Sequence, residues 1–168
     1  MGGLRLVVLA ALCPGCSWLL DFSSSQIPKD AAIDAPYTAD ECAYKEPNDT
    51  VATAAPVTPS DMGPAAICPT SDAGTMDLDY YSFAVPAGTT SVTVSISFTD
   101  ALGDLDLDLD MADGTPITHS RGFGDGESIT CPAQQPPCPS LAAGTYVFEV
   151  YPGEQGATNS YTFTLALQ

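Results

Sequence analysis

Hydrophobic and polar residues alternate one by one along much of the chain. The clearest case is the run 104–111, Asp-Leu-Asp-Leu-Asp-Leu-Asp-Met. Only a β-strand places successive side chains on opposite faces, so the leucines face a core and the aspartates form one row. Neighbouring carboxylates in that row stand ~6.7 Å apart and repel by roughly 0.6 kcal/mol in water. We therefore expect the row to be a hydrated acidic face.

The same alternation predicts further short strands, separated by turns rich in Gly, Pro and Asp. These strands lie near residues 81–85, 92–98, 116–120, 127–131, 146–150 and 161–167. Asp113-Gly114 is a hairpin signal. No segment has the pattern of an amphipathic helix. Seven or more strands with one apolar face each predict an all-β domain, an antiparallel β-sandwich or jelly roll of seven to nine strands.

The first forty residues differ in composition from the rest. The apolar run Leu6 to Leu12 is too short for a transmembrane helix and has the length of a signal-peptide core. Gly15-Cys16-Ser17 resembles a bacterial lipoprotein cleavage site, with an ordinary cleaved signal or an uncleaved anchor as the alternatives. We expect a signal segment 1–16 with lipid on Cys16, a flexible tether 17–41 and one domain 42–168, exported and held at the cell envelope, or extracellular.

The net charge limits the possible partners. The chain has 21 Asp and Glu residues against four Lys and Arg residues, a net charge of -17. Such a surface repels phosphate backbones, so nucleic acid is excluded as a partner. Divalent cations are its natural counter-ions.

The predicted domain contains four cysteines, Cys42, Cys68, Cys131 and Cys138. An even number in an exported chain predicts disulfides, and four cysteines allow three pairings. Cys131 and Cys138 flank a short Pro-rich stretch, which favours a bridge across that loop and leaves Cys42 to pair with Cys68. Zinc binding is the alternative, but CxxC spacing is missing and His119 is the only histidine.

Sequence signatures of catalysis are missing. The chain has neither G-x-S-x-G nor H-E-x-x-H. His119 is its only histidine, and adjacency to Ser120 does not make the two a catalytic pair. The expected disulfides leave no thiol nucleophile in the domain. We expect the protein not to be an enzyme.

Several short motifs occur in the order typical of one family. They are Glu46-Pro-Asn-Asp-Thr50, Asp77-Leu-Asp-Tyr-Tyr-Ser-Phe83 with Pro86-Ala-Gly88, Asp106-Leu-Asp-Leu109, and Ala143-Gly-Thr-Tyr146 with a late Tyr161. From about residue 42 onward the chain thus resembles the bacterial pre-peptidase C-terminal domain, which is related to the collagen-binding domains of clostridial collagenases. The resemblance implies a non-catalytic β-sandwich that accompanies secreted peptidases and other exported proteins.

The resemblance also implies a calcium site. In calcium-binding relatives the ligands come from the segment before the first strand and from aspartates at the start of a later strand. The matching residues are Glu46, Asn48, Asp49, Asp77 and Asp79. Carboxylate and amide oxygens suit Ca²⁺, which takes six to eight oxygen ligands. The expected Cys42–Cys68 disulfide brackets this region. It is an alternative to calcium as the feature that holds the segment in place.

Three tyrosines are candidate ligand contacts by analogy with the collagen-binding relatives: Tyr80, Tyr151 and Tyr161. They imply a recognition role toward a polysaccharide or an extended polypeptide. The alternative is a purely structural surface lipoprotein with no specific ligand. Exposed tyrosines gathered on one sheet face favour recognition, and buried tyrosines favour the structural role.

Overall fold

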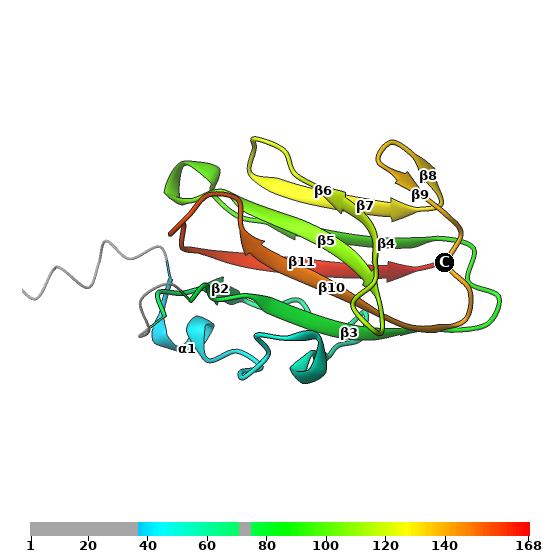
Figure 1. Cartoon of the computed structure of the whole chain (residues 1–168), viewed down its shortest axis with the longest axis horizontal. Helices are drawn as coiled ribbons and strands as arrows, with labels where there is room; N and C mark the ends of the chain where they lie inside the picture. The colour runs from blue at the N-terminus through cyan, green and yellow to red at the C-terminus, as the bar shows by residue number, and fades with distance from the viewer. Residues whose placement is uncertain (1–36, 71–74) are drawn as a thin grey trace, which may run out of the picture. The chain divides into compact units, whose positions relative to one another are not determined.

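The computed structural model describes residues 37–70 and 75–168, which form two packed β-sheets (Figure 1). The predicted signal segment, Cys16 and most of the tether lie outside the described residues. A short helix, α1 (Ala39–Cys42), lies partly in the stretch expected to be tether, capped by the side chain of Thr38. The described residues contain no helix that is long and apolar enough to cross a membrane.

The larger sheet has five strands, in the spatial order β1-β3-β10-β5-β6. Their bounds are β1 Ala55–Pro56, β3 Asp79–Val85, β10 Gly144–Pro152, β5 Leu105–Met111 and β6 Pro116–Ser120. All pairs in this sheet are antiparallel except β1 with β3, which is parallel.

The smaller sheet has four antiparallel strands, in the order β2-β11-β4-β7. Their bounds are β2 Ala65–Ile67, β11 Asn159–Leu167, β4 Val92–Ser97 and β7 Gly126–Cys131. In Figure 1 the two sheets lie one behind the other, with β10 crossing in front of β11. A small hairpin, β8 (Ala133–Gln134) with β9 (Pro137–Cys138), and two 3-10 turns, η2 (Val51–Thr53) and η3 (Asp100–Leu102), complete the described elements.

The predicted β-sandwich and its seven alternating strands are confirmed. The pattern did not reveal β1, β2, β8 and β9, because strands of two or three residues are too short to show alternation. All four are peripheral, so their omission left the fold class unchanged.

Aromatic side chains fill the space between the sheets. The ring centroid of Tyr81, on β3, lies 5.0 Å from that of Phe148 and 4.9 Å from that of Phe163. Phe148 and Phe163, from opposite sheets, are 5.5 Å apart. These are the separations of favourable tilted ring pairs, so the aromatic cluster joins the two sheets.

The aspartate row on β5 is less hydrated than its sequence suggests. The leucines face the core as predicted, but Asp106 and Asp110 are buried as well, and Asp104 and Asp108 are half-buried. Near one end of this face, Val51 of η2 lies close to Gly114 in the β5–β6 turn.

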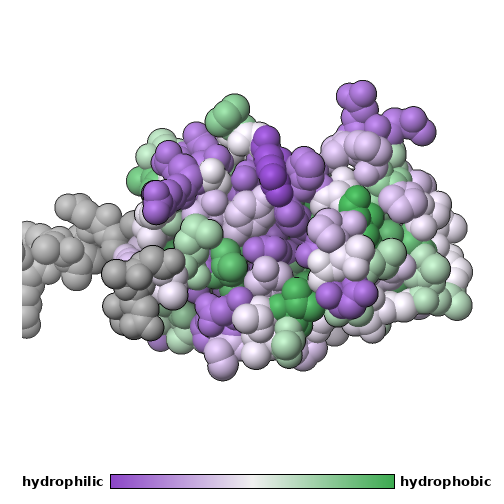
Figure 2. All heavy atoms as spheres, viewed as in Figure 1, coloured by the Kyte–Doolittle hydropathy of each residue, from purple (hydrophilic) through white to green (hydrophobic). Residues whose placement is uncertain are grey.

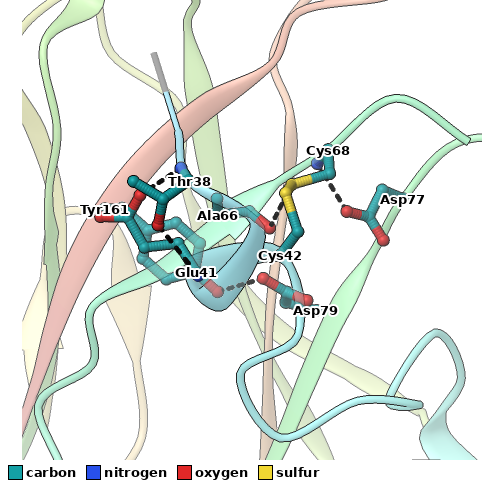
Figure 3. The surroundings of a disulfide bond; sticks show 8 residues. All are labelled: Thr38, Glu41, Cys42, Ala66, Cys68, Asp77, Asp79 and Tyr161. Atoms are coloured by element: carbon teal, nitrogen blue, oxygen red, sulfur yellow. Dashed lines mark hydrogen bonds between the residues drawn. A yellow bond between two sulfur atoms is a disulfide. The ribbon is translucent and has the colours of Figure 1, made fainter. Parts of the chain in front are cut away.

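Both predicted disulfides are confirmed. Cys42 at the end of α1 is bonded to Cys68, which follows β2 (Figure 3). Cys131 at the end of β7 is bonded to Cys138 on β9 and closes the Pro-rich loop.

Three of the four outermost strands of the two sheets are short or interrupted, whereas β7 has six residues in regular register with β4. β1 has two residues and includes Pro56, and β2 has three residues. β6 begins at Pro116, and its register with β5 shifts between Leu109 and Asp110. Each of these features shortens the row of backbone groups that an edge strand presents.

Candidate metal centre

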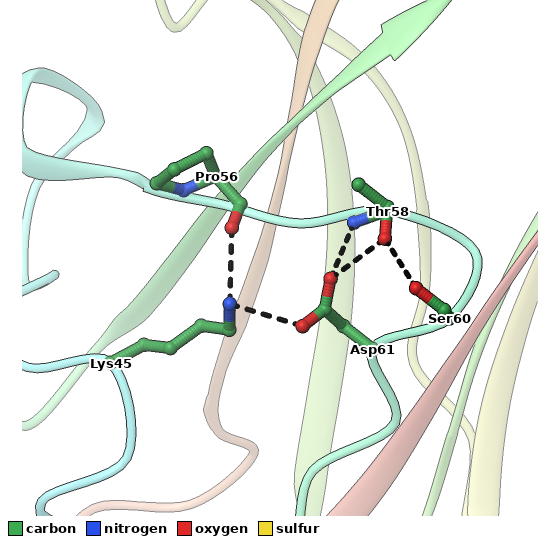
Figure 4. A network of polar contacts seen from close by, with 5 residues as sticks. All are labelled: Lys45, Pro56, Thr58, Ser60 and Asp61. Carbon is green, nitrogen blue, oxygen red and sulfur yellow. Dashed lines mark hydrogen bonds and ion pairs between the residues drawn. The ribbon is translucent and has the colours of Figure 1, made fainter.

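The segment between α1 and η2 is fixed in place by Lys45. Its ammonium group donates to the carbonyl oxygen of Pro56 at 3.1 Å and pairs with Asp61 at 3.2 Å (Figure 4). Asp61 in turn accepts from the backbone nitrogen and the hydroxyl of Thr58, and these bonds hold the pKa of Asp61 below its usual value. Glu46, the next residue along the chain, is thereby directed toward the start of β3.

Three carboxylates converge where this segment meets β3. Oxygen atoms of Glu46, Asp77 and Asp79 all lie within 4.8 Å of one another. Ca²⁺ binds oxygens at 2.3–2.6 Å, so this spread matches oxygens arranged around one ion. Asp77 and Asp79 are buried and Glu46 is half-buried. The exposed carboxylate of Asp49 stands beside Asp77 at the rim.

Asn48 lies at the base of the cluster and is fully buried, with 0 % of its surface exposed. Its backbone carbonyl accepts from the nitrogen of Tyr80 at 3.0 Å, which joins the segment to β3. One side-chain amide atom lies 2.9 Å from Glu46 Oε2 and 3.2 Å from Asp79 Oδ1. With nitrogen there, the amide donates to both carboxylates. With oxygen there, it adds a neutral ligand to the set, so Asn48 suits the cluster with or without a cation.

Asp79, the first residue of β3, is 1 % exposed. Its Oδ2 accepts a short hydrogen bond from the hydroxyl of Tyr161 on β11 (Figure 3). That hydroxyl lies 2.8 Å from the hydroxyl of Tyr81. The pair of tyrosines thus connects the carboxylate cluster to the aromatic core.

Asp77 is held from the other side of the site. Its Oδ2 accepts from the backbone nitrogen of Cys68 at 2.6 Å, and Cys68 is bonded to Cys42 (Figure 3). The disulfide therefore fixes the backbone donor that orients Asp77. It supports the cluster without occupying it.

The cluster carries more negative charge than its surroundings can stabilise. Burial raises the pKa of Asp79 to about 8 and that of Asp77 to about 6, and it also raises the pKa of Glu46. Carboxylates nearby add to each rise. The described cationic side chains are engaged elsewhere, Lys45 with Asp61 and Arg121 with Asp108. A divalent cation is the natural partner of such a site.

The structure brings four of the five predicted metal ligands together, Glu46, Asn48, Asp77 and Asp79, and leaves Asp49 exposed at the rim. It does not bring the three predicted ligand-binding tyrosines together. Tyr161 is only 2 % exposed, so its assignment as a surface contact is wrong. It faces inward on β11 because β11 alternates, and its hydroxyl binds Asp79. Tyr80 and Tyr151 are half-buried and share the outer face of the larger sheet.

The roles of Tyr161, Tyr81 and Cys68 at this site do not follow from the sequence pattern. The one signal in the sequence is a tyrosine at an inward-facing strand position. A buried hydroxyl needs a hydrogen-bond partner, so such a tyrosine predicts a polar contact in the core. The identity of that partner depends on how β11 lies across β3, which the sequence pattern does not contain.

Asp110 gives a pH-dependent prediction. Burial, and then the charge of Asp108, raise its pKa to about 6, and its Oδ1 has no hydrogen-bond partner. The folded state thus holds this proton more tightly than the unfolded chain, so its stabilising contribution is complete below about pH 4 and is lost as the pH rises through about 6. Allowing for screening, Asp110→Asn should raise the free energy of unfolding by about 1–2 kcal/mol near pH 8 and hardly change it near pH 4.

Urea unfolding at the two pH values measures this difference. Asp113→Asn is the matched control, because Asp113 is an exposed turn residue whose carboxylate accepts from Thr115. A similar gain from both substitutions at the higher pH would show that only net charge matters.

Comparison with known proteins gives one family match. Residues 77–152, from the cluster aspartates to the end of β10, match the sequence profile of the bacterial pre-peptidase C-terminal domain. No curated protein sequence matches the chain. Among solved structures, the pre-peptidase C-terminal domain of Bacillus anthracis collagenase aligns with a TM-score of 0.49 and 13% identity, over 66% of this chain and 92% of that one. A periplasmic inhibitor of g-type lysozyme from Aeromonas hydrophila aligns with a TM-score of 0.39 and 15% identity, over 67% and 94%.

Proposed function

We propose that this chain, whose residues 77–152 match the sequence profile of the bacterial pre-peptidase C-terminal domain, is a non-catalytic accessory domain that works outside the cytoplasm. In this proposal Ca²⁺ orders the domain at the Glu46–Asp79 cluster, and the domain recognises an extended polypeptide or a polysaccharide. The observation that carries the calcium assignment is the convergence of three carboxylates and the buried amide of Asn48.

The chemistry of the cluster supports calcium over other ions. All the candidate donors are oxygens, supplied by Glu46, Asn48, Asp77 and Asp79, with Asp49 at the rim. Zinc prefers nitrogen and sulfur, and the nearby cysteines are bonded to each other. Magnesium requires a tight octahedron and keeps several waters, so a cluster of several protein oxygens favours the larger ion.

Bound calcium would compensate the negative charge of the carboxylates. The residues of this chain position those carboxylates. Glu46 and Asn48 belong to the segment before η2, while Asp77 and Asp79 lead into β3. Both parts would thus hold the cation between them, at the point where the chain enters the sandwich. Tyr161 keeps Asp79 oriented from the core side, and Cys68 keeps Asp77 oriented from the disulfide side.

An accessory role outside the cytoplasm has further support. The two disulfides are typical of oxidising compartments. The non-catalytic part of the proposal is supported by His119, the single histidine of the chain. It is exposed on β6 and pairs in register with Asp108 on β5. We include attachment through a lipid on Cys16, which lies outside the described residues, as part of this proposal.

Calcium should raise the melting temperature of the purified protein, and chelation should lower it. An ion that binds only the native state stabilises by about 2.7 kcal/mol at a hundredfold excess over Kd, which is several degrees for a domain of this size. Scanning calorimetry in chelator, in CaCl₂ and in MgCl₂ measures the shift. The rise in magnesium should be smaller.

Substitutions locate the ion. Asp77→Asn and Asp79→Asn should each abolish the calcium-dependent rise, whereas Asp106→Asn, on the outer face of β5, should retain it. If Asp106→Asn abolishes the rise while the other two keep it, the ion belongs to the β5 row. If calcium and chelator leave the melting temperature of the parent protein unchanged, the disulfide orders this region alone.

A further inference from the structure

The outer face of the larger sheet carries a second group of charged and aromatic side chains, distinct from the calcium cluster. One row of residues crosses four strands at matched register: Tyr80 on β3, Glu149 on β10, Asp108 on β5 and His119 on β6. In the space-filling view of Figure 2 hydrophilic side chains gather over β5 and β6. Half-buried Tyr151 stands beside this row on β10.

This face already binds one cation of the chain itself. The guanidinium of Arg121, just beyond β6, donates to both carboxylate oxygens of Asp108, at 3.0 and 3.2 Å. It also lies over the ring of Tyr151, 5.5 Å from the centroid, and the Tyr151 hydroxyl donates to Asp108 at 2.9 Å. A carboxylate and a tyrosine ring thus hold a basic group together.

A similar set of groups next to it is paired with no cation from residues 37–70 or 75–168. Asp110 is 5 % exposed, and its Oδ1 has no partner. Glu149, opposite Asp108, is a diagonal neighbour of Asp110, and the Tyr80 hydroxyl lies beside Glu149. A buried carboxylate without a donor is costly. The other described cation outside this face, Lys45, is bound to Asp61.

We propose that Asp110, Glu149 and Tyr80 form a subsite for a basic side chain, a lysine or arginine of an extended polypeptide that lies across the sheet beside Arg121. The inference rests on the proposed recognition role and names its ligand class. Half-exposed Glu149 and Tyr80 form the accessible part of the subsite, and Asp110 lies at its base.

The geometry distinguishes this ligand from the alternatives. Among the described residues, the cluster of Glu46, Asp77 and Asp79 is the one set whose carboxylate oxygens converge as a metal ion requires. Asp108, Asp110 and Glu149 are spread more widely, which suits ammonium or guanidinium donors that reach several acceptors. A neutral polysaccharide brings no charge to compensate Asp110.

Fluorescence anisotropy with a labelled oligolysine peptide tests the proposal at physiological salt, with the same peptide fully acetylated on its lysines as the neutral probe. Asp110→Asn and Glu149→Gln should each weaken oligolysine binding about tenfold, or about 1.4 kcal/mol. Asp113→Asn removes the same charge from an exposed turn and should change the affinity less than about twofold. Tyr80→Leu should weaken binding and Tyr80→Phe should keep the ring contribution.

Equal weakening by all three charge substitutions would overturn the proposal, because it would show attraction to net charge alone. Equal binding of the acetylated peptide would overturn it too. Calcium-dependent melting of the same variants separates the two proposals. If calcium still raises the melting temperature but peptide binding is not site-specific, the subsite proposal is wrong and the calcium proposal stands. If peptide binding is site-specific but calcium leaves the melting temperature unchanged, only the calcium proposal is wrong.

Discussion

Phe163→Ala should lower the free energy of unfolding by about 3–5 kcal/mol, a large share of the stability of a domain of this size. Phe163 lies on β11, is fully buried and contacts rings from both sheets. Its removal leaves a cavity that Tyr81 and Phe148 cannot fill without breaking their own contacts. Urea unfolding with constant m-values measures the loss.

Phe163→Leu is the matched control, because it keeps most of the volume and should cost less than about 1.5 kcal/mol. Calcium should still raise the melting temperature of this variant, since the carboxylate cluster is untouched. If Ala and Leu at this position are equally destabilising, the loss comes from the ring geometry and the cavity explanation is wrong.

Removing the Cys42–Cys68 disulfide should destabilise the domain more than removing Cys131–Cys138. The two bridges close loops with sequence separations of 26 and 7, for which chain entropy gives contributions of about 3.5 and about 2.4 kcal/mol. Paired Cys→Ala variants of each bridge, compared by urea unfolding in chelator, measure the difference.

The first bridge should also affect calcium binding. Cys68 donates its backbone N–H to Asp77, so the Cys42→Ala/Cys68→Ala variant should bind calcium more weakly by isothermal titration, while the Cys131→Ala/Cys138→Ala variant should bind it as the parent protein does. Equal calcium affinities in the two variants would show that the bridge does not position Asp77.

Strand alternation predicted this fold well because most of its strands bury one face and expose the other. The run 104–111 shows both the strength and the limit of that reasoning. The inward leucines followed directly from the two-residue period. The burial of Asp110 did not, because it depends on how side chains of the neighbouring strands pack over the outer face.

The candidate site shows the same division. Glu46, Asn48, Asp77 and Asp79 were predicted from the family resemblance, which rests on short motifs of adjacent residues. Tyr161 was predicted to contact a ligand at the surface, but it faces the core. Its true partner, Asp79, lies 82 residues away in the sequence and becomes a neighbour only when the two sheets pack together.

The short edge strands of the larger sheet affect whether copies of the protein can pair edge to edge at high concentration. A sheet grows into a fibril when a long, flat edge pairs with the edge of another copy. Here the β1 edge ends after two residues at a proline, and the β6 edge begins at a proline beside an irregular register. The two edges of the larger sheet therefore offer little backbone with which the edge of another copy can pair.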